Sequence, residues 1–140
     1  MKMKFFKEAE KESHLSDYNG QHLGAVAVYA DKVILARGHN TERTRTSQQR
    51  FNIYRVKDKS NILEKPAKAH AEIELYDKIK YLDVDFSRVS VYIYRKMKSG
   101  ELGMARCCPA CMAALKSLGI KKICYTTDAG YAEERIEQNK

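Results

Sequence analysis

Apolar residues recur along the chain with periods that predict an ordered series of helices and strands. Helical spacing in residues 3–15 predicts an amphipathic first helix. The segments 24–30 and 32–38 are apolar and Val-rich with a short polar break between them, which predicts an antiparallel hairpin. Residues 40–65 have no clear period and are expected to form a long loop, with a short helical turn inside it. Good helix formers over 67–82 predict the next helix.

The second half of the chain continues with a strand, a helix and another strand. Apolar and polar or aromatic residues alternate over 88–96, which predicts a third strand. A helix is expected over 109–118 with Gly119 ending it, and the apolar segment 120–127 is expected to be strand four. A strand, helix and strand in one sheet imply a parallel crossover, so the sheet should be mixed. We expect residues 132–140 to form at most a short, fraying helix.

Composition and length favour one folded domain over residues 1–140, and the alternation of predicted helices and strands makes it an α/β domain. Hydrophobic residues make up 44% of the chain and charged residues 31%, a balance typical of folded proteins and not of disordered ones. No apolar segment approaches the roughly 20 residues that span a bilayer. The first residues become charged too soon for a signal peptide, so we expect a cytoplasmic protein with no membrane association.

Positive charge is concentrated in one part of the predicted loop. The formal net charge of the whole chain is +8. Residues 43–68 contain eight Lys or Arg against two acidic residues, which is a net charge of about +6. Such a segment attracts phosphate groups, either of free nucleotides or of a nucleic-acid backbone. The alternative is a solvated loop that keeps the protein soluble.

Two short segments carry candidate metal chemistry. His70 and Glu72 lie at a predicted helix start, and Cys108 and Cys111 lie at the start of the next helix, 38 residues after His70. A helix N-terminus carries partial positive charge, which favours the thiolate form that zinc requires. One imidazole and two thiolates are three ligands, whereas closed structural zinc sites have four. The pattern therefore predicts a Zn²⁺ site with one position open.

An open position beside a carboxylate is suited to hydrolysis. Zinc lowers the pKa of a water in that position towards about 7, which makes hydroxide available at neutral pH. If Glu72 takes up the proton and passes it first to a ring nitrogen and then to a departing amine, one carboxylate serves as base and acid. The predicted chemistry is the hydrolytic release of ammonia.

Together and in this order, the His-x-Glu and Cys-x-x-Cys segments resemble the zinc-dependent deaminases of the cytidine deaminase superfamily. The resemblance extends over nearly the whole chain, from the first helix to the segment ICYTT. It implies a three-layer α-β-α fold, a mixed sheet with helices on both faces. It also implies zinc on His70, Cys108 and Cys111, with Glu72 as the proton shuttle. Related enzymes are often homo-oligomers, so a homodimer or larger assembly is expected by analogy.

The resemblance also implies substrate contacts. Asn40, at the end of the second strand, matches the asparagine that holds the substrate in this family, and the backbones of Ala71 and Cys107 match positions that contact the base. The family usually has proline where Cys107 stands. Cys107 could replace Cys108 as a ligand, but the two-residue gap to Cys111 favours Cys108.

The remaining cysteine and two histidines have simpler interpretations. Cys124 lies in an apolar strand and is expected to be a buried core thiol. His22 and His39 flank the hairpin, where they could line the pocket, although isolated histidines near turns are more often solvated or bonded to the backbone.

Three functions follow from these observations. The first is deamination of a small cytosine-containing nucleoside or nucleotide, of the cytidine, deoxycytidine or dCMP type. The second is deamination of a base within tRNA or single-stranded nucleic acid, which the basic segment favours and the scarcity of interleaved aromatic residues opposes. The third is a non-catalytic, zinc-stabilised binding module in which Cys107 completes a four-ligand site.

Overall fold

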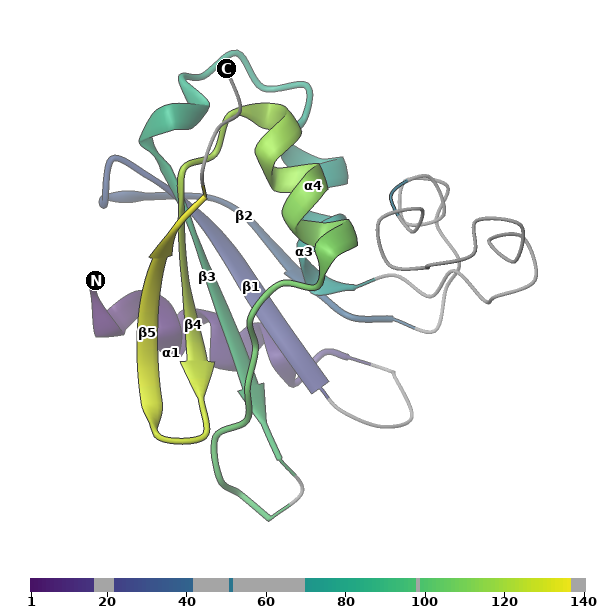
Figure 1. Ribbon diagram of the computed structural model, residues 1–140, viewed down its shortest axis with the longest axis vertical. Helices are drawn as coiled ribbons and strands as arrows, with labels where there is room; N and C mark the ends of the chain where they lie inside the picture. The colour runs from purple at the N-terminus through teal and green to yellow at the C-terminus, as the bar shows by residue number, and fades with distance from the viewer. Residues whose placement is uncertain (17–21, 42–50, 52–69, 98, 137–140) are drawn as a thin grey trace, which may run out of the picture.

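The computed structural model describes residues 1–16, 22–41, 51, 70–97 and 99–136. Its order of elements begins with a helix, a hairpin and a second helix, and continues with strands around a third helix (Figure 1). The elements are α1 (Met3–Ser13), β1 (His22–Tyr29), β2 (Val33–His39), α3 (Ala71–Ile79), β3 (Val89–Lys96), α4 (Pro109–Leu118), β4 (Lys122–Thr127) and β5 (Gly130–Arg135). A 3-10 turn, Phe86–Arg88, precedes β3.

Five strands form one mixed sheet in the order β2-β1-β3-β4-β5. β1 is antiparallel to both β2 and β3, with Ala27 opposite Ala36 on one side and Val91 on the other. β3 and β4 are parallel, and α4 connects them, which confirms the predicted crossover. β2 and β5 are the two edges of the sheet.

Helices cover both faces of the sheet. α1 crosses one face, and α3 and α4 pack side by side on the other (Figure 1). Successive residues of a strand point to opposite faces, so each central strand contributes to two cores. In β1, Ala25 and Ala27 pack under α3 and α4, whereas Val26 and Val28 pack under α1. The α-β-α arrangement agrees with the prediction.

The aromatic residues of β3 belong to the α1 side. Tyr92 is fully buried, and its ring lies 5.0 Å from that of Phe6 in an edge-to-face arrangement. The hydroxyl of Tyr94 donates to Glu10 Oε2 at 2.8 Å. Cys124 packs in the same core and is fully buried, as predicted. These side chains therefore support α1 and face away from the two helices that carry the candidate metal ligands.

Two expectations about element boundaries were wrong. The helix expected over 67–82 begins only at Ala71, because His70 has extended backbone angles and serves as its N-cap. Of the residues expected to form a fraying helix, 132–135 belong to the strand β5 instead, with Ala132 paired to Tyr125 and Arg135 to Lys122, and 137–140 lie outside the described residues. Ala, Glu and Arg favour helices in isolation, but the unpaired edge of β4 offers hydrogen bonds that outweigh this weak preference.

The basic segment 43–68 lies outside the described residues, except for Phe51. Of the short helical turn expected near residues 48–54, only Phe51 is described, and its ring packs edge-to-face against Tyr76 at 5.3 Å. Within the part of the chain that the structure describes, no helix is long and apolar enough to cross a bilayer.

Candidate metal centre and active site

The candidate ligands lie at the starts of two neighbouring helices. His70 is the N-cap of α3, and Cys108 is the N-cap of α4. Pro109 occupies the first turn of α4, where its missing N–H removes no helical hydrogen bond. Cys111 lies in the same turn, so the Cys-x-x-Cys spacing brings both sulfurs to one side of the helix start. The packing of α3 against α4 then brings the imidazole to the two thiols.

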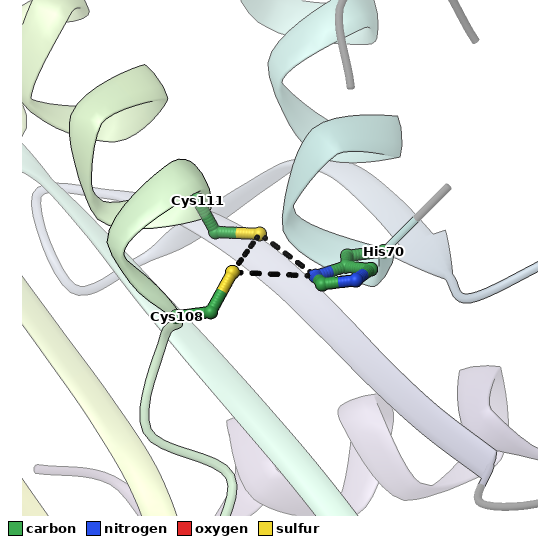
Figure 2. Close-up of side chains that lie close together, drawn as sticks. All are labelled: His70, Cys108 and Cys111. Carbon is green, nitrogen blue, oxygen red and sulfur yellow. Dashed lines mark hydrogen bonds between the residues drawn. The ribbon is translucent and has the colours of Figure 1, made fainter. Parts of the chain in front are cut away.

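The three ligand atoms form a small triangle. His70 Nδ1 lies 3.2 Å from Cys111 Sγ and 3.5 Å from Cys108 Sγ, and the two sulfurs are 3.6 Å apart. Figure 2 shows the three side chains pointing toward one another, with His70 reaching across from α3 to the first turn of α4. His70 and Cys108 are partly exposed, whereas Cys111 is fully buried. One edge of the triangle is therefore open to an incoming molecule.

This triangle fits zinc. Zinc–sulfur bonds of about 2.3 Å and zinc–nitrogen bonds of about 2.0 to 2.1 Å at tetrahedral angles place nitrogen about 3.6 Å from sulfur and two sulfurs about 3.8 Å apart. The observed separations of 3.2, 3.5 and 3.6 Å lie within a few tenths of an ångström of these values. Two sulfurs and one imidazole are also the donor set that zinc prefers over magnesium or calcium.

The two thiols differ in acidity. A hydrogen bond with Cys111 is the largest influence on the pKa of Cys108, and together with a bond to His70 it lowers that pKa to about 4 against the opposing effect of burial. Burial raises the pKa of Cys111 well above its ordinary value. Of the pair, Cys108 is thus the sulfur that is already a thiolate at neutral pH, and it is the more exposed one.

Glu72 lies beside this triangle. Its side chain is buried, with a relative exposure of 4%. Burial raises the pKa of Glu72, and the charge of Cys108 adds to that effect, whereas the charge of His70 and a hydrogen bond with Cys111 lower it. All three candidate ligands therefore act on this carboxylate directly. The structure places a candidate proton carrier within reach of the position where a metal would sit.

Cys107 is adjacent to the triangle without being part of it. Among the described residues, the grouping of ligand atoms at the helix starts consists of His70, Cys108 and Cys111. Cys107 is buried, and its thiol faces Glu72, whose charge adds to the effect of burial in raising the pKa of Cys107 well above the ordinary value. The geometry thus groups Cys108, and not Cys107, with His70 and Cys111.

Asn40 is the residue after β2, and it lies close to the start of α3 because the end of β2 packs against that helix. A Cβ built on Gly38 would lie 2.6 Å from the carbonyl oxygen of Ala71, so the end of β2 rests directly on the first turn of α3. Asn40 follows two residues later and is buried. Its Oδ1 accepts hydrogen bonds from Leu23 N at 2.9 Å and from Ser16 Oγ at 2.6 Å, which fix the orientation of the side chain.

The structure also shows a cluster that the sequence analysis did not find. His39 Nδ1 lies 2.9 Å from Glu12 Oε1 and 3.6 Å from Glu74 Oε1. The three side chains come from β2, α1 and α3. His39 was considered only as a pocket or surface residue, because nothing in the spacing of Glu12 and Glu74 indicates that they meet. His22 is exposed at the start of β1.

A mixed α/β fold with a His, Cys and Cys centre at two helix starts defines a class of zinc-site proteins, and the comparisons identify the family. The family model of the cytidine and deoxycytidylate deaminase zinc-binding region matches residues 1–127. The chain therefore belongs to this family. No relative among curated proteins matched the chain.

Solved structures share the fold at low sequence identity. A cytidine deaminase from Burkholderia pseudomallei superposes with a TM-score of 0.66 at 13% identity, covering 97% of this chain and 93% of the other. The dCMP deaminase from the cyanophage S-TIM5 superposes in its apo form with a TM-score of 0.60 at 22% identity, covering 91% and 86%. Its complex with dCMP and dUMP gives 0.60 at 21% identity, covering 91% and 84%.

Proposed function

We propose that this protein is a zinc-dependent deaminase that hydrolyses a cytosine-containing nucleoside or nucleotide to the uracil product and ammonia. The observation that carries the proposal is the open triangle of His70, Cys108 and Cys111 with the buried carboxylate of Glu72 beside it. Three ligands instead of four are the mark of a catalytic zinc site. Membership of the family supports the same chemistry.

Each residue of the site has a role in this proposal. His70, Cys108 and Cys111 would hold Zn²⁺, which when bound supplies positive charge that makes water more acidic. Glu72 accepts the proton of the attacking water and delivers it to a ring nitrogen of the base. It then takes the remaining proton from the hydroxyl that has added to the ring carbon and transfers it to the departing amine. The carbon–oxygen double bond forms as the carbon–nitrogen bond breaks, so ammonia leaves and the carboxylate is regenerated. Burial of Glu72 keeps bulk water from competing for these protons.

Asn40, Ala71 and Cys107 are proposed to position the base. The side-chain oxygen of Asn40 accepts hydrogen bonds from Ser16 and Leu23, which hold this side chain in one orientation at the end of β2. As the first residue of α3, Ala71 has an amide without an intrahelical acceptor. Cys107 would contribute its backbone, and its buried thiol would pack beside Glu72.

A free nucleotide is the favoured substrate. The cyanophage dCMP deaminase that shares this fold is known in complex with dCMP and dUMP, which supports a monophosphate of the same type for this chain. The net charge of about +6 in residues 43–68 supports a phosphate-bearing substrate as well. The same charge favours a second candidate, a base within tRNA or single-stranded nucleic acid. By analogy with related enzymes, we propose that the protein acts as a homo-oligomer in the cytoplasm.

Ammonia release from a defined panel of substrates tests this proposal. Zinc-loaded protein would be incubated with cytidine, deoxycytidine, CMP, dCMP and adenosine, and with a short single-stranded oligonucleotide and tRNA. We expect uracil products from at least one small cytosine compound, with dCMP foremost. Turnover of the polynucleotides alone would replace the first candidate by the second. The absence of turnover throughout, with zinc bound, would favour the non-catalytic binding module.

A further inference from the structure

A pocket lies at the end of the sheet where β3 and β4 begin. Its volume is about 360 Å³, and its lining comes from the turn after β1, the 3-10 turn before β3, and the strands β3, β4 and β5. The charged residues of the lining are Arg88, Lys122 and Arg135, with Asp31 as the acidic one. Three positive charges against one negative charge favour an anion in this pocket.

Three of the lining side chains stand in one row across the sheet. Ser90 of β3 is paired with Lys122 of β4, and Lys122 is paired with Arg135 of β5. Side chains of paired residues on neighbouring strands point to the same face of a sheet. Tyr92 and Cys124, two residues further along β3 and β4, pack in the core under α1, so the row faces the α1 side. The strand register thus places one hydroxyl and two cations next to one another.

Ser90 brings a hydroxyl without a partner to this pocket. The residue is only 5% exposed, and its hydroxyl forms no hydrogen bond within the part of the chain that the structure describes. Among the described residues, the one side-chain atom that is both sealed from solvent and unpaired is Arg95 Nε. The Ser90 hydroxyl is therefore open to the pocket. A nearly buried hydroxyl without a partner is uncommon, and it offers a donor to a ligand that enters.

The two arginines are placed without acidic partners. The guanidinium of Arg88 lies over the ring of Tyr29, 5.1 Å from its centre, and this aromatic face holds it beside the pocket. Arg135 is exposed on the edge strand β5. In the described ranges of the chain, neither arginine forms an ion pair. Their N–H donors are therefore available to a ligand.

Lys122 is held near the pocket by two carboxylates that do not use its donors. Its Nζ lies 3.8 Å from Asp31 Oδ1 and 3.6 Å from Glu133 Oε1, and both distances are too long for a hydrogen bond. The side chains of Asp31 and Glu133 are 51% and 45% exposed, so water screens their charges. The lysine, which is 25% exposed, can therefore donate to an anion in the pocket.

We propose that this pocket binds a phosphate group, either as inorganic phosphate or as part of a small phosphate ester. Guanidinium groups match phosphate because their N–H donors reach two oxygens at once. The Ser90 hydroxyl and the Lys122 ammonium supply further donors from the strands. A volume of about 360 Å³ is far larger than a monatomic ion, and it leaves room for a tetrahedral anion and part of an ester.

The pocket is separate from the proposed active site. The metal ligands lie at the start of α4, whereas α4 ends at Leu118, shortly before β4 begins at Lys122. Ten helical residues are about 15 Å long, so the pocket lies at the other end of this helix. Its row of side chains also faces α1, whereas α3 and α4 cover the opposite face (Figure 1). Binding of phosphate here does not depend on the proposed deaminase activity.

Nuclear magnetic resonance of ¹⁵N-labelled, zinc-loaded protein tests the proposal with inorganic phosphate as the probe. Sodium phosphate would replace sodium chloride at constant ionic strength, so that general screening stays the same. We expect saturable shifts of the backbone amides of Ser90, Lys122 and Arg135, with one phosphate bound per chain. The melting temperature should rise with the bound fraction.

Two variants tie the binding to the pocket. Ser90→Ala and Arg135→Gln should each weaken phosphate binding about tenfold, the factor that corresponds to one lost hydrogen bond to a charged group. Lys7→Gln is the matched control, because Lys7 is an exposed lysine of α1 that does not line the pocket, and this change should leave the affinity unaltered. If Ser90→Ala does not fold, Arg135→Gln keeps the test intact, since Arg135 is exposed.

AMP and adenosine distinguish the two sources of phosphate. Tighter binding of AMP than of inorganic phosphate at these residues, with no shifts there from adenosine, would assign the pocket to phosphate esters. Equal or weaker binding of AMP would assign it to free phosphate. Shifts that do not saturate, or that persist unchanged in Arg135→Gln and Ser90→Ala, would show a general effect of charge and overturn the proposal.

Discussion

Gly38 and Ala71 approach so closely that only glycine fits at position 38. A Cβ there would lie 2.6 Å from the carbonyl oxygen of Ala71 and 3.0 Å from Leu75 N, both of them backbone atoms that cannot move without shifting α3. The glycine thus sets the distance between β2 and the helix α3, which begins at Ala71. Through this contact, the strand that leads to Asn40 and the helix that carries Glu72 are held in one arrangement.

The first prediction follows from this contact. Gly38→Ala should destabilise the fold by about 1 to 3 kcal/mol, the usual cost of an added methyl in a closely packed place. It should also raise KM, because α3 must shift relative to Asn40. Urea unfolding and steady-state kinetics measure the two effects. Ala36→Gly on the same strand is the control, with an expected cost of about 0.5 to 1 kcal/mol and no change in KM. A stable Gly38→Ala variant would contradict the importance of the contact.

Glu72 offers the sharpest test of the proposed chemistry. Glu72→Ala should lower kcat by a factor of about 10² to 10⁴, which is the usual contribution of a general acid and base. Zinc content should stay at the native level, because the three candidate ligands remain in place. Metal analysis and ammonia release on the same preparation separate the two quantities. Turnover that survives the substitution would contradict the role given to this carboxylate.

The metal ligands should be separable from the other cysteines by zinc content. Cys108→Ser is expected to lose most of the bound zinc, because it removes the thiol that is already ionised at neutral pH. Cys124→Ala should keep its zinc, since Cys124 packs in the core on the α1 side. Cys107→Ala should keep it as well. A loss of zinc from Cys107→Ala equal to that from Cys108→Ser would favour a four-ligand structural site.

The ion pair between Arg106 and Glu134 should contribute to stability in a pH-dependent way. Arg106 donates two hydrogen bonds of 2.8 Å to Glu134, and this contact lowers the pKa of Glu134 below its ordinary 4.5. A lowered carboxyl pKa stabilises the fold above the ordinary value, and the contribution is lost as the pH falls through the pKa of the folded state. The pair is partly exposed, so its contribution should be at most about 1 kcal/mol.

Urea unfolding of the native protein and of Glu134→Gln as a function of pH measures this contribution. The native protein should be slightly more stable at neutral pH, and the difference should vanish well below pH 4.5. Glu101→Gln, an exposed carboxylate in the preceding loop, is the control and should give no such pH-dependent difference. A difference that persists in acid would show that Glu134 acts through packing and not through its charge.

Much of the fold and of the candidate site could be predicted from residue patterns. The period-two alternation of Val89, Val91 and Ile93 predicts a strand, and Pro109 with Gly119 marks the two ends of α4 closely. Such signals are local, because they arise from backbone geometry and from the need to bury one face. The candidate ligands were found for a similar reason, since the Cys-x-x-Cys spacing is a property of one helical turn.

Other features depended on contacts between distant segments. The final strand β5 forms because β4 has an unpaired edge, and local propensity for helix carries no information about that edge. The meeting of Glu12 with His39 and Glu74 joins residues that are 27 and 35 positions apart in the chain. No local pattern records such a contact.

By itself, the sequence determined the types of the elements from α1 to β4, the mixed sheet and the chemical identity of the candidate ligand set. Each of these follows from short-range geometry and from the donor atoms that a side chain carries. Only the tertiary structure decided that His70 lies 3.2 Å from Cys111, that Cys107 faces Glu72, and that a second cluster closes around His39. These distances result from the packing of α1, α3 and α4 on one sheet, which the whole core determines together.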